Sequence, residues 1–234
     1  MAKTKAVVLC SGGLNSTVLA TMTQQEHILT MMHVRIGHRA DEREFELFEK
    51  QVDFFDPQHH ISVEMPHFVA IGGNGRVDQD RDLENTRASA EGRSNSYIPG
   101  LVASLLSAAC SWANVIGAGK IMIGVSEDLG PPGPRTSSIF PDFSREHVEL
   151  CRNAILTETA PRALTVEMPL IDLPRADIIK LGQRLHAPFE MTWSCLSSGE
   201  EACGTCYGCV NRARGFVDAG LADPILSREM AGAQ

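Results

Sequence analysis

The sequence lacks any apolar run long enough to cross a bilayer, so no membrane-spanning helix is expected. It also lacks internal repeats and low-complexity tracts, which disfavours repeat architectures and disordered tails. Basic charge is scarce: 21 Lys and Arg against 29 Asp and Glu give a formal net charge of −8. That balance argues against a broad nucleic-acid-binding face. No secretory signal pattern is present, so we expect a reducing, cytoplasmic setting in which disulfides are disfavoured.

What the 234 residues do contain is an alternation of short apolar runs and amphipathic stretches, with an apolar share of 43%. The alternation predicts an α/β fold with a doubly wound parallel sheet. The apolar runs predict strands at 5–10, 27–34, 60–65, 120–125 and 164–168. The amphipathic or apolar stretches predict helices from 16 and at 40–55, 97–116, 144–159 and 175–185. Polar segments at 72–96 and 127–141 are predicted to be long loops, the first of them mobile, at the ligand-binding edge of the sheet.

The first predicted strand runs directly into Ser11-Gly12-Gly13-Leu14-Asn15-Ser16, where a helix begins. Two glycines let the backbone turn sharply and bring N–H groups close to an anion, and the helix N-terminus adds partial positive charge. Ser11 and Ser16 add hydroxyl donors. No lysine follows at the spacing of the common P-loop, so this is a different phosphate-binding turn. A plain strand-to-helix connection is the alternative interpretation.

Four cysteines near the carboxyl end predict a metal site. Cys203, Cys206 and Cys209 form two overlapping C-x-x-C pairs, and Cys195 lies just upstream. Four clustered thiolates in a reducing compartment favour a closed structural zinc site over disulfides or a redox pair. Cys10, Cys110 and Cys151 are isolated in apolar surroundings and are interpreted as small buried hydrophobes.

These motifs together resemble the 7-cyano-7-deazaguanine synthase family (QueC), a branch of the PP-loop ATP pyrophosphatases. The turn at 11–16 is similar to the family's S-G-G-x-D-S loop, and Gly37-His38-Arg39 resembles its G-x-R-H segment. Asn95 to Gly100 resembles the family's N-x-[FY]-[VI]-P-G sequence, and Ile123-Gly124-Val125 resembles the strand before its substrate loop. Thr192 to Cys195 and Cys203-Gly204-x-Cys206-x-x-Cys209-x-x-Arg212 are similar to its zinc knuckle.

The resemblance implies an adenine nucleotide alpha hydrolase-like fold and an ATP-dependent C–N ligase. In that family, ATP adenylates the carboxylate of 7-carboxy-7-deazaguanine, ammonia gives the amide, and a second ATP-dependent round gives the nitrile. ATP, Mg²⁺ and a structural Zn²⁺ are the implied cofactors. A PP-loop domain over 1–190 and a zinc-binding segment over 191–234 are the predicted units. A homodimer is a further expectation.

Three departures from the family pattern surround one pocket. Asn15 stands where the family has aspartate, and Leu101-Val102 replaces Arg-Asn after the Pro-Gly pair. The family's G-Y-P-D-C-R loop is represented only by Ile139 to Arg145, with Arg145 displaced by one residue. These changes leave three hypotheses open. The chain is an ordinary nitrile-forming synthase, a diverged ligase of an antiviral (CBASS-type) operon that couples the deazaguanine to a protein amine, or an inactive binding module.

Roles for individual residues follow from the resemblance. The whole of 11–16, together with His33 and Arg39, is expected to bind the nucleotide. Ser11, Asn15, Ser16, Asp142 and Arg145 are the candidate catalytic residues, and Asp142 is the preferred reader of the base. Weaker candidates have structural alternatives: Glu127 and Asp128 for the base, and His38, Arg212 and Arg214 for phosphate.

Overall fold

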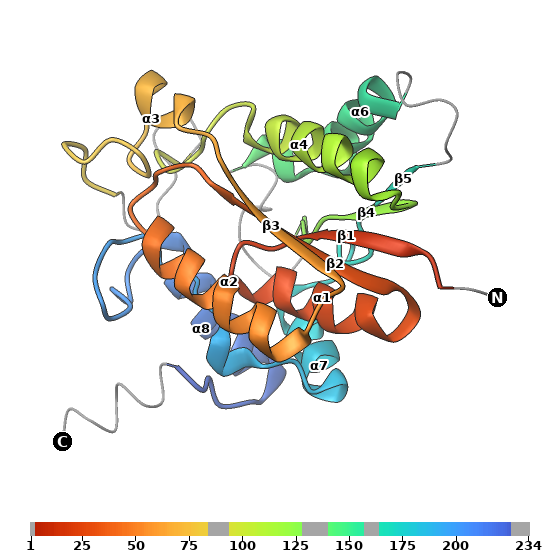
Figure 1. Cartoon of the computed structure of the whole chain (residues 1–234). Coiled ribbons are helices and arrows are strands. Elements are labelled where there is room, and N and C mark those ends of the chain that lie inside the picture. Colours follow the sequence, from red (N-terminus) through yellow and green to blue (C-terminus); the bar gives the residue numbers. More distant parts are fainter. Residues whose placement is uncertain (1–2, 84–93, 128–139, 157–163, 226–234) are drawn as a thin grey trace.

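A five-stranded parallel sheet forms the centre of the computed structural model, which describes residues 3–83, 94–127, 140–156 and 164–225. The strand order is β3-β2-β1-β4-β5 (Figure 1). The strands are β1 (Lys5–Leu9), β2 (Ile28–Arg35), β3 (His59–Glu64), β4 (Lys120–Met122) and β5 (Thr165–Glu167). Every neighbouring pair is parallel, which confirms the fold class predicted from the alternating pattern.

Strand β1 is the central strand because it pairs with β2 on one side and β4 on the other. Its side chains alternate between two buried faces: Ala6 and Val8 pack with one group of helices, and Val7 and Leu9 with the other. Ala6, Val7 and Val8 are fully buried. A strand buried on both faces explains why its sequence is a continuous apolar run with no polar alternation.

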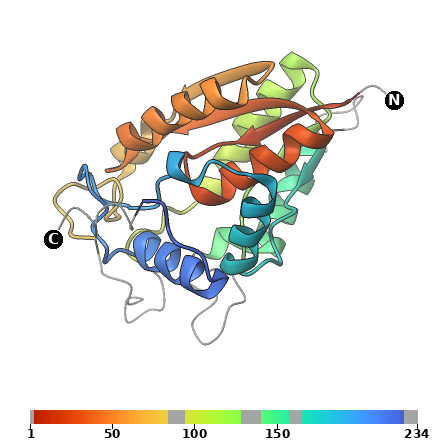
Figure 2. The ribbon, with the colours of Figure 1, turned by 90° about the horizontal axis from the view of Figure 1, so that it is seen from below.

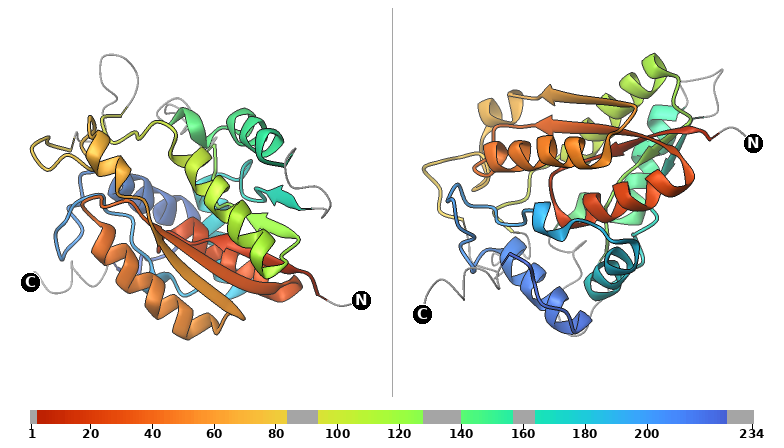
Figure 3. Two further views of the ribbon diagram at one scale, coloured as in Figure 1. Left: turned by 45° about the horizontal axis from the view of Figure 1, so that its top comes forward. Right: turned by 60° about the horizontal axis from the view of Figure 1, so that its bottom comes forward.

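Helices cover both faces of the sheet. The first face is covered by α1 (Leu14–Glu26), α2 (Asp41–Phe55), α7 (Arg175–Leu185) and α8 (Tyr207–Ala219), as the view from below shows (Figure 2). The opposite face is covered by α4 (Leu101–Ile116) and α6 (Arg145–Leu156) (Figure 3). The described residues also include a short helix α3 (His67–Ile71) and the 3₁₀ turns η1 (Pro141–Phe143) and η2 (Phe189–Met191).

The element boundaries differ from the sequence predictions in two places with a clear cause. Helix α4 begins at Leu101 rather than at Tyr97, because Gly100 adopts a left-handed conformation with φ of 77° directly after Pro99. The run predicted as a strand at 120–125 is regular only to Met122; its continuation curves into the cavity described below. The predicted loop segments at 84–93 and 128–139 lie outside the described residues.

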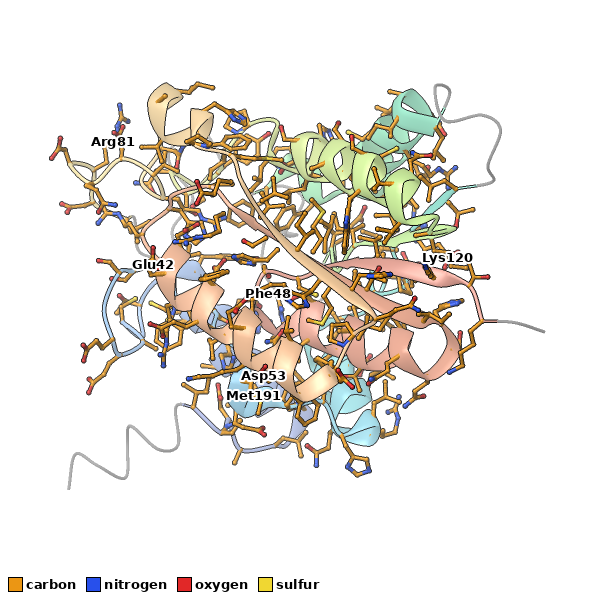
Figure 4. All side chains as sticks on the ribbon, viewed as in Figure 1. Glu42, Phe48, Asp53, Arg81, Lys120 and Met191 are labelled. Carbon is orange, nitrogen blue, oxygen red and sulfur yellow. The ribbon has the colours of Figure 1, made fainter. Side chains whose placement is uncertain are left out.

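The strand order places a switch point between β1 and β4, where the connecting helices leave to opposite faces. In parallel sheets, ligands bind at such a point, beyond the carboxyl ends of the strands. Figure 4 marks the two edges: Lys120 lies at the amino-terminal edge, and Glu42 and Arg81 lie beyond the opposite one. Within the described part of the chain, no helix is long and apolar enough to span a bilayer.

Candidate active site and metal centre

The turn after β1 is shaped by a glycine that no other residue could replace without strain. Gly12 has φ of 71°, and a Cβ there would lie 2.7 Å from the backbone oxygen of Glu44. The close approach brings the start of α2 against the loop. Gly13 occupies the N-cap position of α1, where no side chain accepts a hydrogen bond from the first turn. The N-terminal amides of α1 are therefore left as donors for an anion.

Hydrogen bonds of Ser11 and Ser16 stabilise this loop. Ser11 Oγ accepts the Gly13 N–H at 3.3 Å, and Ser16 Oγ donates to the Gly13 carbonyl at 3.0 Å. The Ser11 N–H donates to Ser16 Oγ at 3.3 Å, which closes a ring of contacts within the turn. Both hydroxyls thus lie at the helix N-terminus, where they and the backbone amides meet the requirements of a phosphate group.

Asn15 connects three elements of the fold. Its Oδ1 accepts a hydrogen bond from Arg175 Nη1 at 2.6 Å, and its Nδ2 donates to the Gly124 carbonyl at 2.9 Å. These partners belong to the start of α7 and to the residues after β4. Because one partner is a donor and the other an acceptor, the amide suits both. Arg175, which no sequence motif identified, consequently lies beside the turn at 11–16.

A cavity of about 300 Å³ opens at this edge of the sheet. Five of the predicted nucleotide-binding residues line it: Ser11, Gly13, Leu14, Asn15 and Ser16. Arg175 lines it from α7, and Tyr207, Gly208 and Asn211 line it from α8. Apolar side chains, among them Leu101, Val102, Leu105 and Phe143, form the opposite wall. The departure Leu101-Val102 therefore makes a wall apolar where the family pattern has Arg-Asn.

His33 lies under the loop and not in the cavity. Its Nδ1 is 2.7 Å from the Cys10 carbonyl, and its ring stacks on Phe48 with the centroids 5.0 Å apart. His33 and Phe48 are both buried, and Figure 4 labels Phe48 on the face of α2 toward the sheet. Burial lowers the pKa of His33 despite the opposing effect of the bond to Cys10, so the ring is neutral at pH 7. Its nucleotide-binding role stays a prediction.

Two predicted arginines do not line the cavity. The Arg39 guanidinium donates to the carbonyls of Gly75 at 2.9 Å, Asp78 at 2.9 Å and Gln79 at 3.0 Å, and so organises the loop after α3. Arg145 is exposed, and its guanidinium pairs with Asp172 at 2.6 Å and lies 4.0 Å from Glu149. The structure thus does not bring Arg39 or Arg145 together with the turn at 11–16.

Two carboxylates predicted as readers of the base, Asp142 and Glu127, are not among the residues that line the cavity, and their role stays a prediction. Asp142 is only 2% exposed in η1, and the N–H of Val102, in the first turn of α4, favours its ionised form. Burial nevertheless raises its pKa, and neither oxygen has a hydrogen bond of normal geometry among the described residues. Glu127 Oε1 accepts the Arg145 N–H at 2.7 Å at the start of α6. Asp128 lies outside the described residues.

The four predicted metal ligands come together. The sulfur atoms of Cys195, Cys203, Cys206 and Cys209 all lie within 4.8 Å of one another. Backbone amides point at these sulfurs: Cys203 N–H lies 3.3 Å from Cys195 Sγ, and Leu196 N–H lies 3.4 Å from Cys206 Sγ. Such N–H···S contacts stabilise thiolates. The cluster fits a tetrahedral metal ion with four thiolate ligands.

Crowding of the four sulfurs affects their ionisation unequally. The neighbouring thiols of Cys195 and Cys209 lower the pKa of Cys206, because both donate to it. Contacts with Cys195 and then Cys206 raise the pKa of Cys209, and the contact with Cys206 raises that of Cys195 to about 11. One thiolate is thus stabilised at the expense of its neighbours, and a divalent cation would remove that competition.

Gly208 allows this centre to approach the rest of the fold. A Cβ at position 208 would lie 1.8 Å from the Ser194 carbonyl, so only glycine permits α8 to start against the segment before Cys195.

Four residues further along α8, Arg212 forms a buried bidentate pair with Asp223, with distances of 2.7 and 2.9 Å. Arg212 also donates to Thr192 Oγ1 at 2.7 Å. Arg212 lines the cavity, but its charge is neutralised within the protein.

Sequence reasoning missed three charged residues that line the cavity. Glu44 in the first turn of α2, Arg76 in the loop after α3 and Arg175 at the start of α7 all contribute to its wall. The three residues come from different parts of the chain, and none belongs to a compact motif. The only local signal was their position after elements that end at the ligand-binding edge.

Comparison with known proteins agrees with this geometry. The family model for "Queuosine biosynthesis protein QueC" matches residues 5–220. The 7-cyano-7-deazaguanine synthase of Oceanobacillus iheyensis is 38% identical over 223 residues, covering 94% of this chain and 97% of that protein. The Chlorobium limicola synthase is 34% identical over 223 residues, covering 94% and 96%. A solved structure, the U34-tRNA thiolase NcsA of Methanococcus maripaludis with its [4Fe-4S] cluster, is similar with a TM-score of 0.46 and 15% identity, over 79% of this chain and 57% of that one. The chain belongs to the QueC family.

Proposed function

We propose that the chain uses ATP to adenylate the carboxylate of 7-carboxy-7-deazaguanine and then couples the acyl group to an amine. In the first step a carboxylate oxygen attacks the α-phosphorus and pyrophosphate leaves. In the second step the amine nitrogen attacks the acyl carbon, AMP leaves, and the nitrogen loses a proton. Adenylation is needed because a carboxylate is a poor electrophile.

The phosphate-binding turn at the switch point is the observation that carries this proposal. Ser11 and Ser16 present hydroxyls beside the free amides of α1, and Arg175 lies next to them through Asn15. Fixed donors around a triphosphate stabilise the charge that develops on the leaving pyrophosphate. Within the described residues this is the part of the cavity that combines amides, hydroxyls and a guanidinium.

The nucleophile that we favour is an amine on a partner protein, as in a CBASS-type antiviral operon. The apolar wall formed by Leu101 and Val102 supports this, because it replaces two polar residues of the family pattern beside the reacting groups. The names of the relatives support the alternative, in which ammonia attacks and the amide is dehydrated to a nitrile.

One experiment separates these reactions. The purified protein is incubated with ATP and 7-carboxy-7-deazaguanine, alone, with ammonia, and with candidate protein amines, while AMP release and product mass are followed. Adenylation that stalls without a protein amine is the expected result. Conversion to the nitrile with ammonia, at a turnover of about 1 per second or more, would establish the alternative. Absence of AMP under all conditions would refute both.

Two metal ions complete the proposal. Mg²⁺ would arrive on the triphosphate oxygens, where it neutralises the charge of pyrophosphate. Zn²⁺ would be held by Cys195, Cys203, Cys206 and Cys209, whose convergent sulfurs and N–H donors fit a closed structural site. Metal analysis of protein purified without chelator is expected to give about one zinc per chain. No zinc in that sample would contradict the assignment.

A further inference from the structure

One wall of the cavity carries three polar side chains that the phosphate-binding turn does not use. His38 follows β2, Glu44 lies in the first turn of α2, and Arg76 comes from the loop after α3. The main chain of Glu44 is held against Gly12, so this wall adjoins the phosphate-binding turn. The three residues come from separate elements and meet only in the folded chain.

A backbone contact fixes the orientation of the His38 ring. The Ala40 N–H donates to His38 Nδ1 at 3.1 Å, so in the neutral ring the proton is on Nε2. His38 Nε2 in turn lies 3.1 Å from Glu44 Oε2 and donates to it. The two side chains are 4% and 13% exposed, so this bond is shielded from water. Glu44 is therefore held in place through one of its two oxygens.

The other oxygen of Glu44 is available to a ligand. Glu44 Oε1 has no hydrogen-bond partner in the described part of the chain. Burial acts to raise the pKa of Glu44, but His38 and Arg76 outweigh it and the net shift is downward. The side chain is consequently an anion at neutral pH. Arg76 faces the same space, and its Nε is buried without a hydrogen bond among the described residues.

An anionic acceptor beside a guanidinium donor matches one edge of a guanine-like base. That edge presents a ring N–H and an exocyclic amino group, both donors, next to a carbonyl acceptor. A carboxylate has about four acceptor sites on its two oxygens, so Glu44 can accept from both donors although Oε2 also accepts from His38, and an arginine donates to the carbonyl. Adenine offers an amino group beside an unprotonated ring nitrogen, and a carboxylate would repel that nitrogen. The wall therefore favours the 2-amino-4-oxopyrimidine ring over adenine.

The predicted carboxylates do not compete for this role where the structure describes them. The Asp142 carboxyl lies beside the first turn of α4, and Glu127 accepts an N–H at the start of α6. Among the described residues that line the cavity, Glu44 is the carboxylate.

We propose that Glu44, oriented by His38 and accompanied by Arg76, binds the 2-amino-4-oxo edge of the deazaguanine substrate. This assignment rests on the proposed function, because it names how the substrate of that reaction is recognised. Glu44 would contact the substrate directly, whereas His38 is a positioning residue that acts through Glu44.

The test measures equilibrium binding of 7-carboxy-7-deazaguanine to the zinc-loaded protein without ATP. Glu44→Gln keeps the size of the side chain but replaces one acceptor by a donor. We expect the variant to bind about 10- to 100-fold more weakly, as for one lost bidentate base contact. Glu46→Gln is the matched control, since Glu46 is an exposed residue of the same helix that pairs with Arg43 at 3.0 Å. Its affinity should equal that of the wild type.

A ligand variant tests the proposal even if Glu44→Gln folds poorly. The analogue that lacks the 2-amino group should bind the wild type more weakly by about tenfold or more, and Glu44→Gln should lose that preference. Equal affinity of the wild type for both ligands would overturn the assignment. So would loss of Mg²⁺ and ATP-analogue binding in a Glu44→Gln protein that keeps its zinc and its unfolding transition, because it would place Glu44 at the nucleotide. If instead the wild type binds no deazaguanine at all, the proposed function fails before this assignment is reached.

Discussion

The buried pair between Arg212 and Asp223 provides a direct test of what holds the carboxyl-terminal segment on the sheet. The guanidinium makes two hydrogen bonds to the carboxylate, and the side chains are only 4% and 6% exposed. A third bond, to Thr192 Oγ1, links the pair to the segment that leads to Cys195. Removing the carboxylate by Asp223→Ala leaves the guanidinium buried without its counter-ion.

The expected loss is large because the charge that remains cannot be solvated. Breaking a buried pair by deleting one partner costs about 3–5 kcal/mol. Helix α8 contains a matched control, because Arg214 and Asp218 form an i,i+4 pair at 3.5 Å with side chains 46% and 50% exposed. An exposed pair of this kind contributes about 0–1 kcal/mol, so Asp218→Ala should change stability little.

Denaturant unfolding of zinc-loaded wild type, Asp223→Ala and Asp218→Ala gives the comparison. With a typical total stability of about 5–15 kcal/mol, the first variant should lose a large part of it. Replacing the whole pair, by Arg212→Met with Asp223→Leu, should recover stability relative to Asp223→Ala, because no unpaired charge remains. If Asp223→Ala and Asp218→Ala differ by less than about 1 kcal/mol, the pair does not hold the segment and the reasoning is refuted.

Three further predictions concern the two motifs. Gly208→Ala should reduce bound zinc to less than about half, since its Cβ would overlap a backbone oxygen at 1.8 Å. Gly204→Ala meets no atom within 4 Å and is strained only by its left-handed φ of 72°, at about 1–2 kcal/mol, so it should retain most of its zinc; metal analysis of both variants decides this. Ser11→Ala combined with Ser16→Ala should lower AMP formation by about 100-fold or more with zinc content unchanged, and wild-type turnover would mean that the loop is only a structural turn. Asn15→Asp should raise the KM for ATP by about tenfold, because its carboxylate partly neutralises the neighbouring guanidinium; a lower KM over a Mg²⁺ titration would contradict this.

The parts of the molecule that the sequence predicted are those whose pattern is local. The run of apolar residues before Ser11 specifies a strand buried on both faces, and the glycines after it specify the turn. The cysteines from Cys195 to Cys209 lie within a short segment, so their spacing alone limits how they can meet. In both cases the residues that cooperate are near one another in the chain.

The rest of the site depends on contacts between distant segments. Arg175 reaches Asn15 across 160 positions, and the packing of α7 against α1 decides that contact. Glu44 lies on a helix whose pattern of Phe45, Phe48 and Phe55 predicts the buried face and says nothing about a polar residue at its start. For Asp142 the motif suggested a ligand contact, and what the sequence could not predict is that the fold buries its carboxyl beside the first turn of α4.

The contacts of Asn15 explain why an amide, and not a carboxylate, fits position 15 of this chain. In the sequence, Asn15 is a departure from the aspartate of the family's S-G-G-x-D-S loop. In the structure the amide accepts from Arg175 and donates to the Gly124 carbonyl, and a carboxylate has no hydrogen to give to that carbonyl. The space is tight, since a Cβ at Gly124 would lie 3.2 Å from the Ser16 nitrogen. An amide therefore joins α1, α7 and the end of β4 without adding a negative charge beside the guanidinium of Arg175. Position 15 therefore carries a neutral amide, and the permanent positive charge of Arg175 lies 2.6 Å from its oxygen.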